Sequence, residues 1–301
     1  MVKTSLPREE YLISGHFACP GCGAALSMRI ALKALGKKAV LSIPACCWAV
    51  IPGPFPYRNL EVPLLYTAFE VTGASVSGLS EGFKAMGEDA IVVGWAGDGG
   101  TADIGLQSLS AAVERGHDFI YVMYDNEAYM NTGIQRSSAT PEYAWTTTTP
   151  VGKREFWKKG WKKDMVGIMV AHRIPYAATA TPAFPEDMYR KFKKAASIKG
   201  PKFIHILSPC PPGWRFPEEK TIEVARKAVL SKVFPLYEVE NGRWRVTFKP
   251  ARFIPVEEYL RMQGRFRYLP EDAVRYVQET VDREWERLLR KEELSKEGPI
   301  W

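Results

Sequence analysis

The chain has 301 residues and a mass of 33.9 kDa, with 46% hydrophobic and 25% charged residues. This balance is typical of a folded globular protein and excludes a disordered chain. The net charge is +7, from 41 basic and 34 acidic residues spread along the chain. Because no nucleic-acid-binding motif accompanies this modest charge, we expect no nucleic-acid partner.

Two segments are candidates for a secretory signal and a transmembrane helix. Residues 1–12 contain several charges and no apolar run, so we expect no secretory signal. Residues 39–57 lack charge and are long enough to cross a bilayer, but prolines stand at positions 44, 52, 54 and 56. Such a segment cannot remain helical in lipid, which excludes a transmembrane helix. We therefore expect a cytoplasmic protein with no membrane partner.

Hydrophobic periodicity predicts alternating helices and strands between residues 24 and 207. The predicted helices are residues 24–35, 72–86, 105–115, 164–171 and 185–198, and the predicted strands are residues 39–43, 90–96, 119–124, 176–181 and 203–207. Continuous apolar runs in the strands are typical of a buried parallel sheet. We therefore predict an α/β fold, a doubly wound parallel sheet with helices on both faces, and one domain over residues 1–210.

After Cys210 the composition changes, and prolines recur through residues 211–301. We interpret this part as an extended arm that wraps a neighbour, packing on the same domain or on a partner subunit. Asn241-Gly242 predicts a hairpin turn within it. Residues 270–293 predict a charged helix with one apolar stripe.

The strongest local motif is Gly97-Asp98-Gly99-Gly100, which follows the strand at 90–96. Asn126 comes 28 residues after Asp98, at the end of the next strand. Both therefore lie at the carboxyl edge of the sheet, where α/β folds bind ligands. The glycines and the helix start at 101–104 suit a phosphate, and the two oxygen ligands suit Mg²⁺. The spacing is similar to the thiamine diphosphate motif; the alternative is a turn that Asp98 merely shapes.

Five cysteines form the second feature, and Cys19 and Cys22 have the C-x-x-C spacing. Cys47 and Cys210 are distant candidates for the two further thiolates that a metal site needs. Zinc and a [4Fe–4S] cluster both accept four thiolates, and the spacing does not separate them. Buried cysteines without a ligand are the alternative. A redox-active C-x-x-C is disfavoured because the expected preceding strand is missing.

Taken together, these residues resemble the beta subunit of the 2-oxoacid:ferredoxin oxidoreductases, and most closely that of the pyruvate enzyme. The resemblance covers nearly the whole chain. The matching strings are Gly15-His16, Cys19-Pro20-Gly21-Cys22-Gly23, Gly97-Asp98-Gly99-Gly100-Thr101, Asp103-Ile104-Gly105, residues 124–133 (YDNEAYMNTG), Gln135-Arg136-Ser137, Ser208-Pro209-Cys210-Pro211, Gly213-Trp214-Arg215 and Gln263-Gly264-Arg265-Phe266-Arg267.

The resemblance implies a sheet of the thiamine diphosphate-binding type and three cofactors: thiamine diphosphate, Mg²⁺ and a [4Fe–4S] cluster. It implies that the cluster is held by Cys19, Cys22, Cys47 and Cys210. Cys46 stands where the family usually has glycine, so we interpret it as the spare thiol.

The resemblance also implies the other site residues. Asp98, Asn126 and the carbonyl of Ala128 would bind Mg²⁺. Asn131 would be catalytic, facing the thiazolium and the substrate carboxylate. Val50 would lie under the cofactor. The remaining cofactor-binding residues that it implies are His16, Gly97, Gly99 and Gly100.

The implied partners follow from the same family. An alpha subunit would supply the glutamate that activates the cofactor, so this chain would be half of an active site. Gamma and delta subunits and ferredoxin would complete the system, with coenzyme A if the substrate is pyruvate-like. Trp48-Ala49-Val50 and Phe55-Pro56-Tyr57 depart from the pyruvate enzymes, which have Leu-Glu-Val and Tyr-Pro-Tyr there. We therefore keep oxalate or an aromatic 2-oxoacid beside pyruvate as the substrate.

Two rival functions are open. One is a non-oxidative thiamine decarboxylase subunit with a structural zinc site, which a colourless zinc protein would favour. The other is a non-catalytic electron-transfer subunit, which absence of thiamine diphosphate from the complex would favour.

Overall fold

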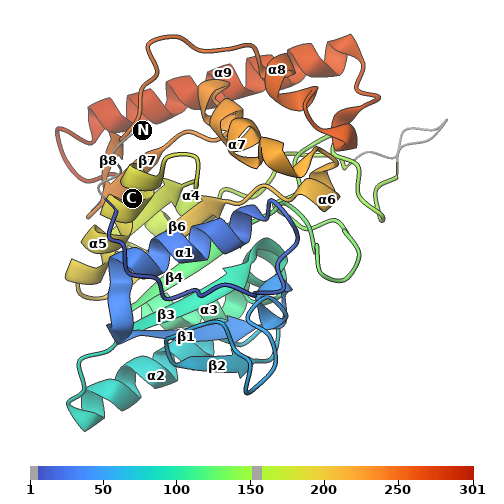
Figure 1. The fold of residues 1–301 in the computed structure, drawn as a ribbon. Coiled ribbons are helices and arrows are strands. Elements are labelled where there is room, and N and C mark those ends of the chain that lie inside the picture. The colour runs from blue at the N-terminus through green and yellow to red at the C-terminus, as the bar shows by residue number, and fades with distance from the viewer. Residues whose placement is uncertain (1–5, 151–157) are drawn as a thin grey trace.

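A mostly parallel sheet of eight strands forms the centre of the computed structural model, which describes residues 6–150 and 158–301 (Figure 1). The strand order is β2-β1-β3-β4-β6-β5-β7-β8; the first six strands are parallel, and β7 and β8 are antiparallel. Their bounds are β1 Ala39–Pro44, β2 Leu64–Thr67, β3 Ile91–Gly97, β4 Phe119–Asp125, β5 Tyr176–Ala180, β6 Pro201–Leu207, β7 Tyr237–Glu240 and β8 Arg243–Val246.

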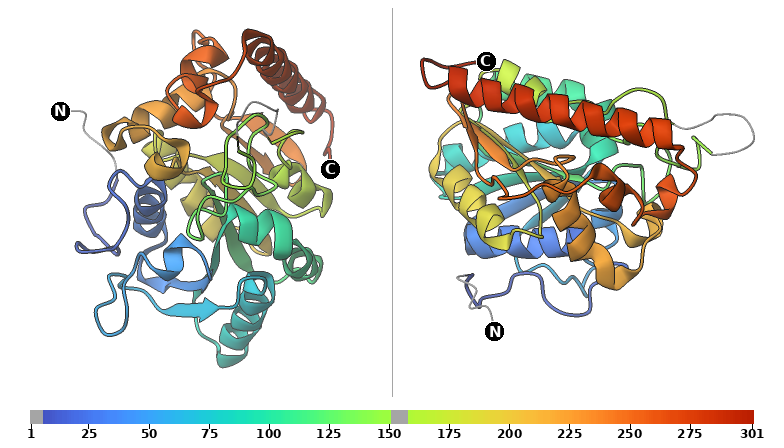
Figure 2. Two further views of the ribbon diagram at one scale, coloured as in Figure 1. Left: turned by 90° about the vertical axis from the view of Figure 1, so that its right-hand side faces the viewer. Right: turned by 90° about the horizontal axis from the view of Figure 1, so that it is seen from above.

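Helices cover both faces of the sheet, as Figure 2 shows from two sides. On one face, Met28 of α1 and Phe192 of α5 pack in one core cluster with Trp95 of β3. On the other, α2, α3 and α4 form a second cluster with residues of β3 and β4. The helices are α1 Gly23–Leu35, α2 Thr72–Met86, α3 Leu106–Glu114, α4 Met165–Ala171, α5 Pro185–Ser197, α6 Pro211–Trp214, α7 Thr221–Leu230, α8 Val256–Leu260 and α9 Glu271–Leu294. No helix within the described residues has the length and apolar character needed to span a bilayer.

The predicted elements between residues 24 and 207 are all present, and their ends agree within two residues. The doubly wound α/β fold is therefore confirmed. The short strand β2 was not predicted. It has four residues at the sheet edge, with Leu65 and Tyr66 exposed, so it lacks the buried apolar run that marks the inner strands.

The interpretation of residues 211–301 as an extended arm is wrong in one respect, because much of this segment folds into helices on its own chain. The unpredicted helix α7 packs with α8, and α8 packs with α9. The hairpin β7–β8 turns at Asn241-Gly242 as predicted, and it extends the central sheet by pairing with β5. The prolines mark helix starts, as Pro255 does for α8 and Pro270 for α9.

Candidate functional site

Asp98 and Asn126 follow the ends of neighbouring strands. Gly97 pairs with Tyr124 in the β3–β4 ladder, so the residues after them leave the sheet side by side. Both are buried, with 1% of Asp98 and 5% of Asn126 exposed. Although Asp98 follows a strand end, it is not an exposed loop carboxylate: Ser137 Oγ donates to Asp98 Oδ2 at 2.5 Å.

The remaining carboxylate oxygen of Asp98 faces two other polar groups. The end of the Asn126 amide lies 2.9 Å from Asp98 Oδ1 and 3.0 Å from the Ala128 carbonyl oxygen. If its nitrogen faces them, it donates to both; if its oxygen faces them, three acceptors converge on one point. Convergent carboxylate, amide and carbonyl oxygens are what Mg²⁺ prefers, so this donor set fits the predicted metal.

The electrostatics of Asp98 also favour a cation. Burial and the nearby charge of Asp125 raise the pKa of Asp98 well above its usual range, although the Ser137 hydrogen bond opposes this. A bound cation reverses that balance, because it stabilises the ionised carboxylate.

A cavity of about 230 Å³ opens beside these oxygens. It is lined by residues of the segments 45–49, 97–100 and 124–132, together with Phe69. The predicted residues Gly97, Asp98, Gly99, Gly100, Asn126, Ala128 and Asn131 all line it. Val50 and His16 do not: Val50 is 52% exposed, and His16 lies beside Cys19 and Cys22 at another surface hollow. Their roles in cofactor binding remain predictions.

Tyr129, for which the sequence predicted no role, forms the wall of this cavity next to Gly99. A Cβ atom at Gly99 would come within 2.4 Å of the Tyr129 ring, so only glycine allows the approach. Tyr129 Oη donates to Asp103 Oδ2 at 2.8 Å, and the Ser138 amide donates to the same oxygen at 3.1 Å. The ring is thereby fixed in place. Asp103 and Tyr129 stood in the strings of the family resemblance, which gave them no role.

Four cysteines approach one another from three separate segments. The Cys22 amide donates to the Cys19 carbonyl at 3.1 Å, and the amide of Gly23 donates to the Pro209 carbonyl at 3.1 Å. The second contact joins the C-x-x-C turn to the residue before Cys210. Burial raises the pKa of Cys210 to about 12, with smaller contributions from the charges of Cys22 and Cys19.

Cys47 belongs to the same neighbourhood. Burial raises the pKa of its thiol far above the ordinary value, and the charges of Cys46, Cys210 and Cys22 raise it further. Thiols that disfavour one another's ionisation in this way fit a site where a cluster neutralises several thiolates. Within residues 6–150 and 158–301, however, cysteine, histidine, aspartate and glutamate side chains form no group of three or more in metal-ligating geometry.

Cys46 differs from the other four cysteines in the hydrogen bond that its thiol makes. Its thiol donates to the Pro44 carbonyl at 3.0 Å and lies against Tyr124 and Gly97. It also lines the cavity beside Asp98. The interpretation of Cys46 as the spare thiol remains a prediction.

Cys47 belongs both to the group of cysteines and to the lining of the cavity. The Asn126 side-chain amide lies 4.0 Å from Cys47 Sγ, and Cys47 itself lines the cavity. The turn at residues 126–128 that is predicted to bind Mg²⁺, called the metal turn below, thus lies next to Cys47, a predicted cluster ligand.

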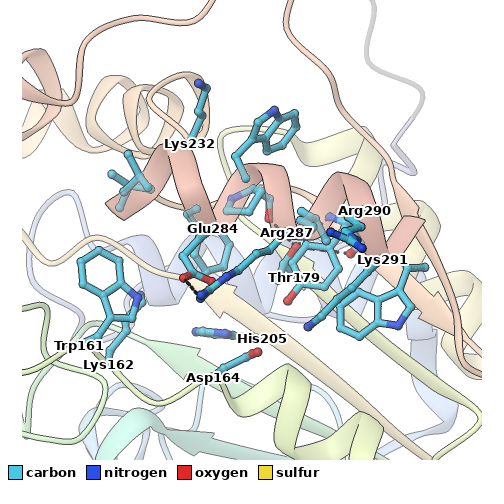
Figure 3. A pocket seen from close by; sticks show the side chains of 18 of the residues that line it. Trp161, Lys162, Asp164, Thr179, His205, Lys232, Glu284, Arg287, Arg290 and Lys291 are labelled. Carbon is cyan, nitrogen blue, oxygen red and sulfur yellow. Dashed lines mark hydrogen bonds and ion pairs between the residues drawn. The ribbon is translucent and has the colours of Figure 1, made fainter. Parts of the chain in front are cut away.

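A larger hollow of about 500 Å³ lies elsewhere, between residues 161–164, residues 232–237 and helix α9 (Figure 3). It contains none of the residues predicted for the cofactor, the metal or the cluster. Lys162 and His205 line it.

The class of protein follows from this fold and site. Residues 62–206, which include the Asp98 and Asn126 motif, match the domain family described as "Thiamine pyrophosphate enzyme, C-terminal TPP binding domain". A solved 2-oxoglutarate:ferredoxin oxidoreductase from Magnetococcus marinus has the same fold, with a TM-score of 0.58 at 21% identity over 74% of this chain and 82% of that one.

Two curated relatives narrow the assignment. The chain is 56% identical to ketoisovalerate oxidoreductase subunit VorB of Pyrococcus abyssi, over 95% of this chain and 94% of the relative. It is 50% identical to pyruvate synthase subunit PorB of Methanocaldococcus jannaschii, over 94% of this chain and 97% of the relative. The chain therefore belongs to the family of 2-oxoacid:ferredoxin oxidoreductase beta subunits that includes VorB and PorB. The resemblance seen in the sequence is confirmed.

Proposed function

We propose that this beta subunit binds thiamine diphosphate, Mg²⁺ and one [4Fe–4S] cluster, and that its complex oxidatively decarboxylates a 2-oxoacid with ferredoxin as electron acceptor. One observation supports this most directly: the proposed metal turn at Asn126 lies 4.0 Å from Cys47, a proposed cluster ligand. Decarboxylation and one-electron transfer need these two centres side by side.

In this proposal the oxygens of Asp98, Asn126 and Ala128 hold Mg²⁺, and the backbone at Gly97, Gly99 and Gly100 admits the diphosphate. When bound, thiamine diphosphate supplies the nucleophilic carbon that accepts the electrons released on loss of CO₂. Asn131, which is exposed and lines the cavity, donates a hydrogen bond to the substrate. Val50 and His16 would contact the cofactor only in the assembled complex.

The cluster would be held by Cys19, Cys22, Cys47 and Cys210. One hydrogen bond supports a shared site, because the Gly23 amide joins the C-x-x-C turn to Pro209, the residue before Cys210.

The other half of the active site would come from a partner. Among the described residues that line the cavity, Asp98 is the only carboxylic acid, and the proposed metal occupies it. An alpha subunit would therefore supply the activating glutamate. Gamma and delta subunits and ferredoxin complete the proposed cytoplasmic system, with coenzyme A if the substrate is pyruvate-like.

For the substrate we propose a branched-chain acid, 2-ketoisovalerate, because the relative that shares 56% identity is named for it. Pyruvate is the second candidate, since the PorB relative is 50% identical. The departures at Trp48–Val50 and 55–57 from the pyruvate pattern agree with this order.

The test is anaerobic purification of the chain with its co-purifying subunits, followed by analysis of iron, sulfide, zinc, magnesium and thiamine. Activity is then measured by viologen reduction with 2-ketoisovalerate, pyruvate, oxalate and phenylglyoxylate. We expect four irons on this chain, bound thiamine diphosphate and the highest kcat/KM with 2-ketoisovalerate. Zinc without iron would support the non-oxidative alternative, and absence of thiamine would support a pure electron-transfer role.

A further inference from the structure

Beside the proposed metal turn lies a buried ionic cluster that the proposed function does not use. We propose that Arg265 and Lys162 are positioning residues: by holding the Glu127 carboxylate between them, they keep residues 125–128 in the conformation that directs the oxygens of Asn126 and Ala128 at Mg²⁺. This inference rests on the proposed function and deepens it.

Glu127 stands between two of the proposed metal ligands and has a strained backbone. Its φ is 64°, in the left-handed region that residues other than glycine seldom adopt. Its amide donates to Asp125 Oδ1 at 2.9 Å, and its carbonyl accepts from Thr140 Oγ1 at 2.8 Å. The left-handed residue reverses the chain, so that the side chain before it and the carbonyl after it face the same point near Asp98.

Each oxygen of the Glu127 carboxylate meets one cation. Lys162 Nζ lies 2.9 Å from Oε1, and the Arg265 guanidinium donates to Oε2 at 2.5 Å. Glu127 is fully buried, and 2% of Arg265 is exposed. A carboxylate removed from water in this way needs both partners, and loss of either leaves an uncompensated charge. The side chain is therefore anchored at both oxygens, which fixes the backbone from which it extends.

Arg265 is itself held in place. Its guanidinium lies 3.9 Å from the centre of the Trp214 ring and donates to Gln263 Oε1 at 2.9 Å. The indole of Trp214 donates to the backbone oxygen of Asn126 at 2.7 Å. Trp214 thus contacts the peptide that joins Asn126 to Glu127, and Arg265 contacts the Glu127 side chain.

Lys162 anchors the other side. Its Nζ also lies 3.6 Å from Asp125 Oδ2, an oxygen that His205 Nε2 approaches at 2.7 Å. Lys162 and His205 line the hollow of Figure 3, whereas Asn126 and Ala128 line the cavity beside Asp98. Positive groups therefore hold both acidic residues that flank Asn126.

The test uses the whole complex, purified anaerobically, with Arg265→Met in this chain. Complexes freed of Mg²⁺ and cofactor by a chelator are given a fixed concentration of thiamine diphosphate and rising Mg²⁺, desalted, and analysed for thiamine. We expect the Mg²⁺ concentration for half-maximal loading to rise roughly tenfold or more, because supports of metal ligands have effects of that size. Full loading should return at saturating Mg²⁺. Arg265→Lys, which keeps the charge, should give a smaller shift.

Lys191→Met is the matched control. It removes another buried cation, which contacts Asp187 at 2.6 Å and the Thr179 carbonyl at 2.9 Å and touches no residue of the turn. This variant should lower the melting temperature and leave the Mg²⁺ midpoint at the wild-type value.

An unchanged midpoint in Arg265→Met would overturn the inference, and so would an equal shift in Lys191→Met, because the effect would then be one of stability alone. If Arg265→Met does not assemble, Glu127→Gln provides the same comparison with an isosteric side chain, and an unchanged midpoint there overturns it too. A wild-type complex that takes up no thiamine diphosphate at any Mg²⁺ concentration would instead reject the proposed function, and this inference with it.

Discussion

Trp214 ties the two proposed centres of this subunit together. Its backbone amide donates to the Cys210 carbonyl at 2.8 Å, and its indole donates to the Asn126 backbone oxygen at 2.7 Å. The ring is fully buried in the packed core, which restricts its movement. A single residue thus links the fourth cysteine of the proposed cluster to the proposed Mg²⁺ turn.

The different roles proposed for the neighbouring Cys46 and Cys47 give a first prediction. Cys46→Ser should leave the iron content of the complex near the wild-type value, because the Cys46 thiol already donates a hydrogen bond to the Pro44 carbonyl. Cys47→Ser should lose most of the iron, because each missing thiolate leaves an iron site open. Iron and sulfide analysis of both anaerobically purified complexes is the measurement. The reverse order would mean that the third cluster ligand is Cys46.

Asp98 gives a second prediction. Asp98→Ala should weaken retention of thiamine diphosphate at least about tenfold, because it removes the carboxylate of the proposed Mg²⁺ site. Iron should stay bound. The fold should also persist, because the substitution relieves repulsion from Asp125, although Ser137 Oγ loses its acceptor. Thiamine content after desalting is measured beside the melting temperature; wild-type retention of the cofactor would contradict the assignment.

Apart from the edge strand β2, the fold up to residue 207 could be predicted because its signals are local. Buried strands such as β3 and β4 are continuous apolar runs, and the helices between them have a clear periodicity. Helix α7 lacks such clarity: its ten residues lie in a proline-rich region, and its buried positions complete a core made with α8 and α9. That core depends on tertiary contacts, which cannot be predicted from the hydrophobic periodicity of a single segment.

In the candidate site, too, some features could be predicted from the sequence and others could not. Asp98 and Asn126 were predictable, because the ends of adjacent parallel strands must meet. The hydrogen bond from Ser137 to Asp98 and the ion pair of Arg265 with Glu127 were not, since the latter joins residues 138 positions apart. Ser137 and Arg265 both lie in the sequence strings that carry the family resemblance, but those strings do not show what the two side chains contact.

Glu238 gives a prediction for pH dependence. Burial opposes its ionisation, but hydrogen bonds from Lys194, Arg245 and Tyr176 prevail and lower the pKa to about 2, from an ordinary value of 4.5. A lowered carboxylate pKa stabilises the fold above the ordinary value, and this contribution is lost as the pH falls towards 2. We expect Glu238→Gln to reduce the free energy of unfolding by about 2 kcal/mol at pH 7, with a smaller difference below pH 4.

Urea unfolding of wild type and variant, followed by tryptophan fluorescence from pH 7 to pH 3, measures this difference. The half-exposed Glu240, whose carboxylate lies 2.6 Å from Lys194 Nζ, is the control. Glu240→Gln should cost less than about 1 kcal/mol, because exposed ion pairs contribute little. A difference for Glu238→Gln that stays constant across this pH range would show that packing, and not ionisation, makes the contribution of Glu238.

The last prediction concerns Asn131 and the chemical step. Within the described residues its side chain makes no hydrogen bond, whereas the loop around it is closed by Thr132 and Gln135, with Gln135 Nε2 donating to the Thr132 carbonyl at 2.9 Å. This favours a role towards the substrate over the alternative that Asn131 only caps the loop. A preorganised neutral donor aimed at developing charge contributes on the order of 3 kcal/mol to the transition state.

Asn131→Ala should therefore lower the rate of 2-oxoacid decarboxylation roughly a hundredfold, while thiamine and iron contents stay at wild-type values. Thr132→Ala is the control, because it removes a contact that closes the loop and leaves the Asn131 amide in place. It should change the rate much less. Single-turnover viologen reduction with 2-ketoisovalerate and with pyruvate separates the chemical step from substrate binding. If cofactor content and stability fall together with activity in Asn131→Ala, the residue serves the loop. If the loaded wild-type complex turns over no 2-oxoacid at all, the proposed reaction itself is wrong.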